Sequence, residues 1–513
     1  MPDSHAQSWN ETFRLILSKK VLALLLLGLS AGIPYFLIFG TLSLWLKEAG
    51  IDRSTISFLS WAALGYSFKF VWAPLIDQLK IPLLAQSLGR RRSWLLISQC
   101  WVIASLLTMA FSDPQHSLWL TTMAAVSLGF AAATQDIVID AYRIESADSS
   151  LQSMLSSAYI AGFRIGMLLG GAGALYLSDW FGGEGYSPTA WTIAYACMAV
   201  AMLAGVFTTL VVEEPVSQRR EVVASRGDNV RLLLGFIICA ASFVLAFVFI
   251  GQHIIELKPW LVELFNNKAL ASFIVESARL LASIVFAFVL VKLAITVELV
   301  PAAVVKRSYI DPIADFFERY GKKTVMLLAL IALYRMSDIV MGVIANIFYV
   351  DAGYTKQQIA SFSKFYGLFA TLAGGFLGGL LSIRYGVYRV LLLGAVLSAL
   401  TNILFSFLAT AAADSTLLMM AITADNLSGG LAMAAFVAYL SSLTSVSFTA
   451  MQYAIFSSLM TLFPKLLAGY SGMVSLAIGY EYFFYLTAAL GIPAVVLVLM
   501  LQRSLPIDKD SPQ

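Results

Sequence analysis

The chain contains a long series of apolar runs, and most are long enough to cross a lipid bilayer as a helix. A membrane helix needs roughly 20 mostly apolar residues. Only 12% of the 513 residues are charged and 59% are hydrophobic, whereas a soluble domain carries about 25% charged residues. The sequence therefore predicts an all-α polytopic membrane protein with about 14 transmembrane helices. The expected spans are 15–46, 55–79, 93–111, 117–142, 150–178, 189–212, 231–254, 270–297, 324–350, 356–382, 388–408, 416–440, 447–469 and 480–502.

The first apolar run is too long for the core of a cleavable signal peptide, so we expect it to be retained as a span. Basic residues concentrate in alternate loops, for example at Arg90–Arg92 and at Lys322 and Lys323. Short cytoplasmic loops are enriched in Lys and Arg. We therefore expect both termini to be cytoplasmic.

Several function classes find no support in the sequence. The net charge of +3 is too small to indicate a nucleic-acid partner. The three cysteines, Cys100, Cys197 and Cys239, fall in apolar runs and are expected to be small core residues, not a disulfide framework or a metal site. We see no phosphate-binding loop and no nucleophile–base pair, so we expect neither an enzyme nor an ATP-driven pump, and no cofactor.

The span at 117–142 carries charged residues that a lipid-facing helix would not tolerate. Asp136, Asp140 and Arg143 follow an i, i+4, i+7 spacing, which places them on one helical face. A carboxylate at membrane depth costs roughly 2–3 kcal/mol or more unless it faces protein or a wet cavity. This polar face therefore predicts a transport path. Other spans also carry charges at depth: the bases Lys69, Arg164, Arg335 and Lys364, and the acids Asp338 and Asp425.

Two loops suggest an internal repeat. Residues 74–92 and 378–389 resemble two copies of the G-x-x-x-D-R-x-G-R-R loop of the major facilitator superfamily, the first keeping Asp77 and the second Gly386. Two copies imply two six-helix bundles related by an axis along the membrane normal. The expected division is a bundle at 1–215, a cytoplasmic linker at 216–230, two inserted transmembrane helices at 231–297, an amphipathic linker at 298–323 and a bundle at 324–513.

The sequence more narrowly resembles the AmpG-type muropeptide permeases. The resemblance rests on motifs in both bundles, among them FKFVWAPLID (68–77), TQDIVIDAYR (134–143), LYRMSD (333–338) and DNLSGGLAMAAFVAYL (425–440). Asp425 stands where the family's motif has a glutamate, which keeps an acid in place. The family's extra helices lie toward the C-terminus, whereas here they are central.

This resemblance implies proton-driven import of anhydromuropeptides (GlcNAc-1,6-anhydroMurNAc peptides) from periplasm to cytosol. The import serves peptidoglycan recycling and, in many bacteria, β-lactamase induction. It further implies a monomer in the bacterial inner membrane, whose partners are an anionic glycopeptide, protons and lipid. Two alternatives remain open. One is a transporter of the same fold for another anionic cargo, such as an acyl-CoA carrier-like protein or an exporter, and the other is a non-transporting membrane sensor.

Within this reading each polar residue receives an expected role. The predicted substrate-binding residues are Arg164, Arg335, Lys364, Lys69, Gln135, Asn426, Gln452, Tyr35 and Tyr366. The predicted proton-coupling acids are Asp338 or Asp425, then Asp136, and the predicted gating residues are Asp77, Arg90, Arg91, Arg92, Asp140, Arg143, Arg384 and Arg389. The competing interpretation is that such residues only pair helices with one another. For the glycine pairs 170–171, 374–375 and 429–430, close helix packing is the favoured interpretation.

Overall fold

A computed structural model describes residues 18–51, 66, 68–146, 149–182, 186–215, 226–266, 268–354, 356–411, 413–468 and 471–504, and every regular element in these ranges is a helix. The chain divides into two compact units. The first comprises Met1–Ala73, Lys80–Arg219 and Tyr320–Gln513, and the second comprises Pro74–Leu79 and Arg220–Arg319. Residues 55–65 and 67 of the span expected at 55–79, and residues 216–225 of the expected linker, lie outside the described residues.

Thirteen helices in the described ranges are long and apolar enough to cross a membrane. Each overlaps one expected span, and the remaining expected span is the one at 55–79. The prediction of an all-α polytopic membrane protein is therefore confirmed.

The N-terminal helices of the first unit, the N-terminal set, begin at residue 19. They are α2 (Lys19–Phe36), η1 (Leu37–Thr41), α3 (Leu42–Glu48), η3 (Lys69–Val71), α7 (Leu84–Leu88), α8 (Arg90–Ala110), α9 (Pro114–Glu145), α10 (Ser149–Leu168), η4 (Leu169–Gly173), α11 (Ala174–Gly182), α12 (Pro188–Ala201) and α13 (Leu203–Val211). Local sequence explains several helix starts. Asp113 accepts a hydrogen bond from the Gln115 N–H at the start of α9, and Pro114 occupies the first helical position.

Glycines bring α2 and α10 unusually close together. A Cβ atom on Gly162 would lie 1.9 Å from the carbonyl oxygen of Leu25, and one on Gly32 would lie 2.0 Å from that of Phe163. Gly170 approaches Ile33 in the same way, at 2.3 Å. Small residues let membrane helices touch backbone to backbone, so the packing interpretation holds for this contact.

The C-terminal helices of the first unit form the C-terminal set. They are η7 (Gly321–Lys323), α20 (Thr324–Leu333), α21 (Met336–Asp351), α22 (Lys356–Ile359), η8 (Ala360–Tyr366), α23 (Gly367–Tyr385), α24 (Val387–Thr410), α25 (Ser415–Leu443), η9 (Val446–Phe448), α26 (Thr449–Ala468), α27 (Ser471–Ala489) and α28 (Ile492–Ser504). Helices α23 and α25 pack through Gly374 and Gly430, whose added Cβ atoms would lie 2.0 Å and 2.2 Å from backbone oxygens. Gly429 has no heavy atom within 4 Å of an added Cβ, so packing does not explain that position.

The two similar loops share one backbone feature. Gly89 precedes α8 with φ +85°, and Gly386 precedes α24 with φ +87°. A positive φ of this kind favours glycine over any other residue. The same backbone requirement therefore explains why a glycine stands at this position in both loops.

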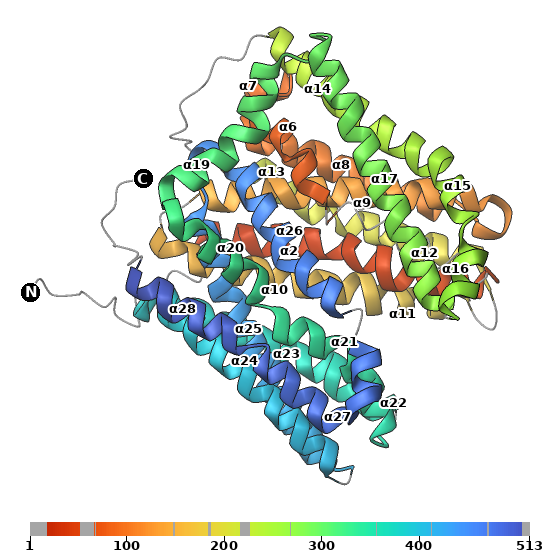
Figure 1. Cartoon of the computed structure of the whole chain (residues 1–513), viewed down its shortest axis with the longest axis vertical. Helices are drawn as coiled ribbons and strands as arrows, with labels where there is room; N and C mark the ends of the chain where they lie inside the picture. Colours follow the sequence, from red (N-terminus) through yellow and green to blue (C-terminus); the bar gives the residue numbers. More distant parts are fainter. Residues whose placement is uncertain are drawn as a thin grey trace, which may run out of the picture. The chain divides into compact units, whose positions relative to one another are not determined.

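The second unit is built from α6 (Ala73–Gln78), α14 (Arg226–Leu245), η5 (Ala246–Ile250), α15 (Gly251–Ile255), α16 (Lys258–Phe265), α17 (Lys268–Thr296), α18 (Ala302–Val305), η6 (Lys306–Ile310) and α19 (Asp311–Tyr320). Helices α14 and α17 lie side by side (yellow-green and green in Figure 1). The Arg279 guanidinium on α17 donates to the carbonyl oxygen of Phe247 and lies 3.8 Å above that residue's ring. These contacts satisfy one of the charged side chains that α17 carries among its apolar residues.

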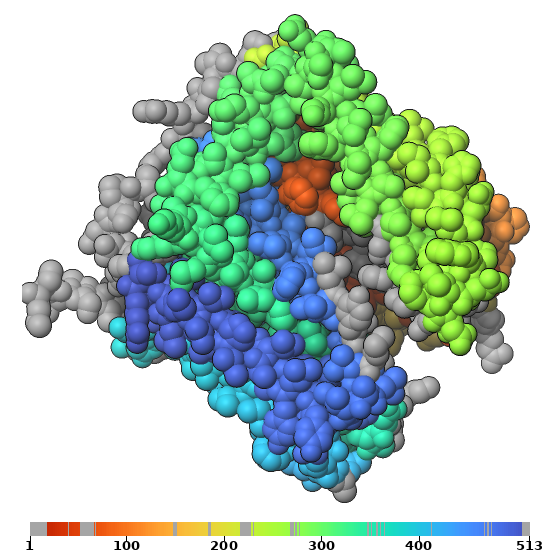
Figure 2. Space-filling view, viewed as in Figure 1, coloured from red at the N-terminus to blue at the C-terminus, as the bar shows by residue number. Residues whose placement is uncertain are grey.

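Several helices expose apolar side chains, as expected of surfaces that face lipid. Leu476 on α27 and Ile492 on α28 are both exposed, and these two helices lie at the molecular surface (dark blue in Figure 2).

The cysteines were expected in the core, and that prediction is wrong. Cys100 and Cys197 are exposed and Cys239 is half-buried, because an apolar run in a membrane helix need not point inward.

Candidate functional site

A first charged cluster lies within the N-terminal set. The Lys69 ammonium on η3 lies 2.5 Å from the Asp136 carboxylate and 3.6 Å from that of Asp140, both on α9. The Tyr159 hydroxyl on α10 donates to the other oxygen of Asp136 at 2.5 Å. The i, i+4 spacing on α9 thus places both acids on one face, as predicted. Three of the expected site residues, Lys69, Asp136 and Asp140, meet here.

Arg143 continues this cluster toward the end of α9. Its guanidinium lies 3.2 Å from Asp140 and donates to Ser156 on α10 at 2.9 Å. It also donates to Ser441 on α25 at 2.6 Å and lies 5.1 Å from the ring centroid of Tyr453 on α26. Arg143 has no exposed surface. It therefore joins the N-terminal set to the C-terminal set.

A second connection between the two sets involves Glu145, two residues after Arg143 on α9. Arg91 on α8 donates to both carboxylate oxygens of Glu145, at 3.0 and 2.5 Å, and to the Thr449 hydroxyl on α26 at 2.8 Å. The Thr449 hydroxyl in turn donates to Glu145. Arg90 lies 3.6 Å from the same carboxylate. Bidentate hydrogen bonds between an arginine and a carboxylate are stronger than hydrogen bonds between neutral groups.

Two acids that the sequence did not single out hold the start of α8. These are Glu145 and Glu214, the latter accepting the backbone N–H groups of Arg91 and Arg92 at 2.7 and 3.0 Å. A sequence signal for such an acceptor was present. The first N–H groups of a helix need acceptors, and α8 begins after Gly89, which has no side chain to cap them. The Arg92 side chain donates to the carbonyl oxygens of Thr209 and Leu210.

A third cluster lies within the C-terminal set and contains two acids. The Ser398 hydroxyl on α24 donates to Asp338 on α21, and Thr401, one turn along α24, lies 3.5 Å from Asp425 on α25. Arg335 lies 3.7 Å from Asp338. Asp338 and Asp425 are close enough to interact electrostatically, and Arg335 acts on both. Arg335 is thus the cation that pairs with Asp338, and Asp425 lies within its electrostatic influence without a direct contact.

Arg164 on α10 is partly exposed and differs from the other bases within the spans. It makes no hydrogen bond or ion pair with the described part of the chain, and its electrostatic neighbours are Arg335 and Tyr35. Tyr35 itself packs against Tyr66 and Phe163, with ring centroids 5.5 Å apart in each case. Two cations from opposite helix sets therefore lie near one another, beside an aromatic group. This arrangement can attract an anion that carries an apolar or sugar face.

Two predicted binding residues are held inside the helix packing. The Gln135 amide has no exposed surface and donates to Ser30 at 2.9 Å. Gln452 is 1% exposed and its side-chain oxygen accepts the Ser445 N–H at 2.7 Å. In this conformation both take part in contacts within the helix packing, and their binding of substrate stays a prediction.

The other predicted residues have the following local surroundings. Asn426 accepts a hydrogen bond from Thr371 at 2.8 Å, and the Tyr366 hydroxyl accepts one from Thr423 at 3.2 Å. Arg384 lies 5.8 Å from the ring centroid of Tyr385, Arg389 is exposed at the start of α24, and Asp77 is buried in α6. The backbone of Lys364 lies in η8, but its side chain falls outside the described part of the structure.

Comparison with known proteins agrees with this architecture. The sequence profile of the Major Facilitator Superfamily matches residues 24–305 and 326–513. The chain is 30% identical to the Rickettsia felis protein named as transporter AmpG 4, over 95% of this chain and 98% of that protein. It is 26% identical to the anhydromuropeptide permease of Escherichia coli, over 94% of this chain and 79% of that protein.

Solved structures with a similar fold are themselves transporters. The proton:xylose symporter XylE bound to 6-bromo-6-deoxy-D-glucose superposes with a TM-score of 0.57 at 12% identity, covering 97% of this chain and 96% of that one. A human organic anion transporter superposes with a TM-score of 0.54 at 13% identity, covering 94% and 99%. At these identities the likeness shows the fold alone. Because the superfamily profile spans most of the sequence and the AmpG likeness runs almost from end to end, this chain belongs to the major facilitator superfamily and, within it, to the AmpG family of transporters.

Proposed function

We propose that this protein imports anhydromuropeptides from the periplasm to the cytosol, driven by the proton gradient. The observation that carries the proposal is the likeness, over 94% of the chain, to a protein named anhydromuropeptide permease. The charged clusters inside the helix bundle support it, because buried charges in membrane helices mark substrate and proton pathways. The proposed location is the bacterial inner membrane, with both termini cytoplasmic. The proposed roles in peptidoglycan recycling and β-lactamase induction follow from this cargo.

Arg164 and Arg335 are the proposed anchors for the cargo's negative charges. They come from opposite helix sets, and Arg164 has no counter-ion among the described residues. An anionic glycopeptide between them would replace their mutual repulsion with attraction. Tyr35 beside Arg164 offers an aromatic face for a sugar ring. Lys364 and Asn426 remain further candidates.

Asp338 and Asp425 are the proposed proton-coupling pair. Like-charged carboxyl groups that share a site do not ionise independently, so one of them holds a proton more readily. Protonation would release Arg335 from part of its attraction to these acids and leave it available to the cargo. This links proton binding to cargo binding at one residue. Asp136, paired with Lys69 and Tyr159, is the next candidate.

The gate is proposed at the end where Arg143 contacts Ser441 and Arg91 contacts Thr449. The distribution of basic loop residues supports a cytoplasmic position for this end. The conformation described here would then be closed toward the cytosol. We retain the division into two six-helix bundles, 1–215 and 324–513, with two inserted helices between them, as part of this proposal. Cargo would pass by alternating opening of the two bundles.

The test is uptake of radiolabelled anhydromuropeptide into right-side-out vesicles, with and without an imposed proton gradient. Gradient-dependent accumulation above vesicles that lack the protein is the expected result. An excess of unlabelled anhydromuropeptide should abolish it, whereas an equal excess of the same peptide without the sugars should not. Absence of uptake under both conditions would reject the cargo. The same assay with other anionic solutes then separates this proposal from a transporter of the same fold for another cargo, and from a non-transporting sensor.

A further inference from the structure

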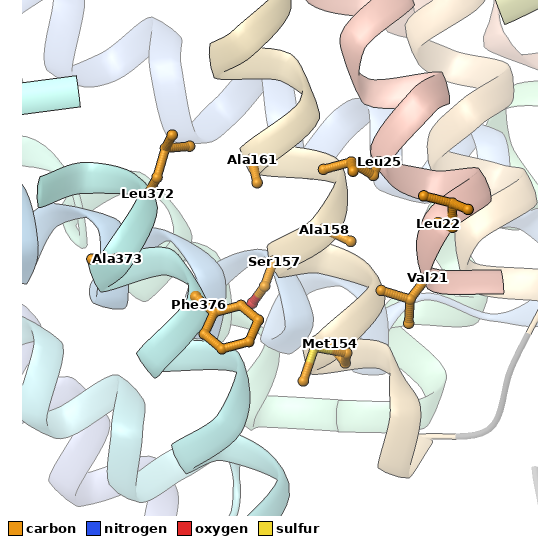
Figure 3. A pocket seen from close by; sticks show the side chains of 10 residues that line it. All are labelled: Val21, Leu22, Leu25, Met154, Ser157, Ala158, Ala161, Leu372, Ala373 and Phe376. Carbon is orange, nitrogen blue, oxygen red and sulfur yellow. The ribbon is translucent and has the colours of Figure 1, made fainter. Parts of the chain in front are cut away.

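An apolar pocket of about 420 Å³ lies between α2, α10 and α23, apart from the charged clusters. Figure 3 shows Leu22 and Leu25 from α2, Ala161 from α10, and Leu372 and Phe376 from α23 around it. Its one hydroxyl group, that of Ser157, already donates to the carbonyl oxygen of Ser153 in its own helix. The pocket therefore offers almost no unsatisfied polar atom to a ligand.

The rim of the pocket faces outward from the helix bundle. Leu22 is 53% exposed and Phe376 is 37% exposed. All three helices belong to segments long and apolar enough to cross the membrane. In a bilayer such a rim meets lipid tails, which are as apolar as leucine. In a bilayer a pocket with such a rim and lining would open to hydrocarbon.

Positive charge lies at one end of the pocket. Lys19 and Lys20, at the start of α2, are both exposed and directly precede the pocket-lining stretch of that helix. Lys20 uses one N–H group on the carbonyl oxygen of Ser146 at 2.6 Å, and an ammonium has three such groups to donate. At 1.5 Å of rise per residue, Leu25 lies roughly 9 Å below Lys19 along the helix axis. A headgroup at the lysines and the upper part of an acyl chain in the pocket match this spacing.

We propose that this pocket binds an anionic phospholipid, with its acyl chain between α2, α10 and α23 and its headgroup at Lys19 and Lys20. The site does not depend on the identity of the transported cargo. Its walls come from both helix sets, α2 and α10 from one and α23 from the other. Just beside it the two sets touch directly, because a Cβ on Gly379 of α23 would lie 2.2 Å from the Ser157 hydroxyl. The bound chain therefore completes the contact between the two sets at this position.

The test uses the full-length protein in phosphatidylcholine nanodiscs that contain a small fraction of phosphatidylglycerol with a photoreactive group on its acyl chain. After illumination, labelled peptides are mapped by mass spectrometry. Label in the α10 and α23 segments that line the pocket is the expected result. Ala161→Phe, which fills the pocket, should reduce that label at least about fivefold. Ala104→Phe, at an exposed position on α8, is the matched control and should leave the label unchanged.

The headgroup is tested with the Lys19→Gln, Lys20→Gln double variant. Each basic residue near an anionic membrane surface contributes about a fivefold preference, so this variant should label equally with phosphatidylglycerol and phosphatidylcholine probes. Lys322→Gln, an exposed lysine elsewhere in the same unit, should keep the wild-type preference.

Leu372→Trp replaces Ala161→Phe if the latter does not fold. Equal labelling of wild type and pocket-filling variant, equal labelling by both probes in wild type, or cross-links to a second copy of the chain would each overturn the proposal.

Discussion

Arg143 on α9 donates a 2.6 Å hydrogen bond to Ser441 on α25, a residue 298 positions further along the chain. The same guanidinium pairs with Asp140, whose carboxylate also lies 3.6 Å from the Lys69 ammonium. One continuous set of polar contacts thus runs from the interior of the N-terminal set to the C-terminal set. A change of charge at Asp140 therefore acts on the guanidinium that joins the two sets, and Asp136 is linked to Asp140 through Lys69.

Glu145→Gln is expected to loosen the closed end of the transporter. The Glu145 side chain is 1% exposed and accepts two bonds from Arg91. Removing one partner of a buried ion pair costs about 3–5 kcal/mol, and this loss falls on the closed conformation. Spin labels are placed near the last residue of α9 and the first residue of α26. The distances between them, measured by double electron–electron resonance, should become longer and more broadly distributed. Asp315→Asn, in a partly exposed pair with Arg319, is the control, and a distribution identical to wild type would argue against a lock at Glu145.

Arg164→Gln is expected to weaken cargo binding while leaving the fold intact. Arg164 has no hydrogen bond or ion pair with any described residue, and a hydrogen bond to a charged group contributes about 1.5–3 kcal/mol. The KM for uptake should rise about tenfold or more, with Tm unchanged. Arg164→Lys keeps the charge and should recover part of the loss. Arg143→Gln, which breaks buried contacts, should instead lower Tm. A similar Tm loss at Arg164 would assign that residue a structural role.

Asp425→Asn is expected to uncouple transport from the proton gradient. The substitution removes the carboxyl group that interacts electrostatically with Asp338, the partner of Arg335. Gradient-driven accumulation should disappear, while exchange of labelled for unlabelled cargo, which needs no net proton movement, should continue. Asp414→Asn on the same helix is the control, because asparagine also caps helix starts and Asp414 caps α25 through the Thr416 N–H. Loss of both accumulation and exchange would contradict a coupling role.

Gly162→Ala is expected to destabilise the protein through the contact between α2 and α10. The new methyl group would lie 1.9 Å from a backbone oxygen of Leu25, which cannot move without shifting the helix. Overpacking of this kind typically costs about 1–3 kcal/mol. Gly429→Ala has no atom within 4 Å and alanine favours helix, so its Tm should equal or exceed that of wild type. Equal Tm values for the two variants would contradict the close-packing argument.

The Asp113 carboxylate between α8 and α9 is expected to make stability depend on acid pH. Burial raises its pKa, but hydrogen bonds from the Tyr186 hydroxyl, the Gln115 N–H and His116 outweigh burial and lower the pKa below its usual value of 3.8. A lowered folded-state pKa gives stability that is present above the unfolded value and is lost as pH falls through the folded value. The Tm advantage of wild type over Asp113→Asn should therefore hold at neutral pH and vanish in strong acid. An advantage independent of pH would reject the assignment.

The sequence determined the class of fold and the positions of most spans. Apolar runs of membrane length must become helices, because a backbone in hydrocarbon has to satisfy its own hydrogen bonds. The i, i+4 spacing also placed Asp136 and Asp140 on one face, which the contacts of Lys69 with both acids confirm. Local rules further explain the glycines at 89 and 386, whose positive φ few other residues adopt.

Only the tertiary structure decided which charges meet. Glu145 and Glu214, not marked in advance, hold the start of α8, and Arg143 contacts Ser441 from a distant part of the chain. Gln135 donates a hydrogen bond to Ser30 on α2, a partner that its own helix does not reveal. A helical period shows which residues share a face but not which helix that face contacts. Which helices contact one another depends on how the whole bundle packs. That packing involves residues far apart in the chain, so no local pattern in the sequence reveals it.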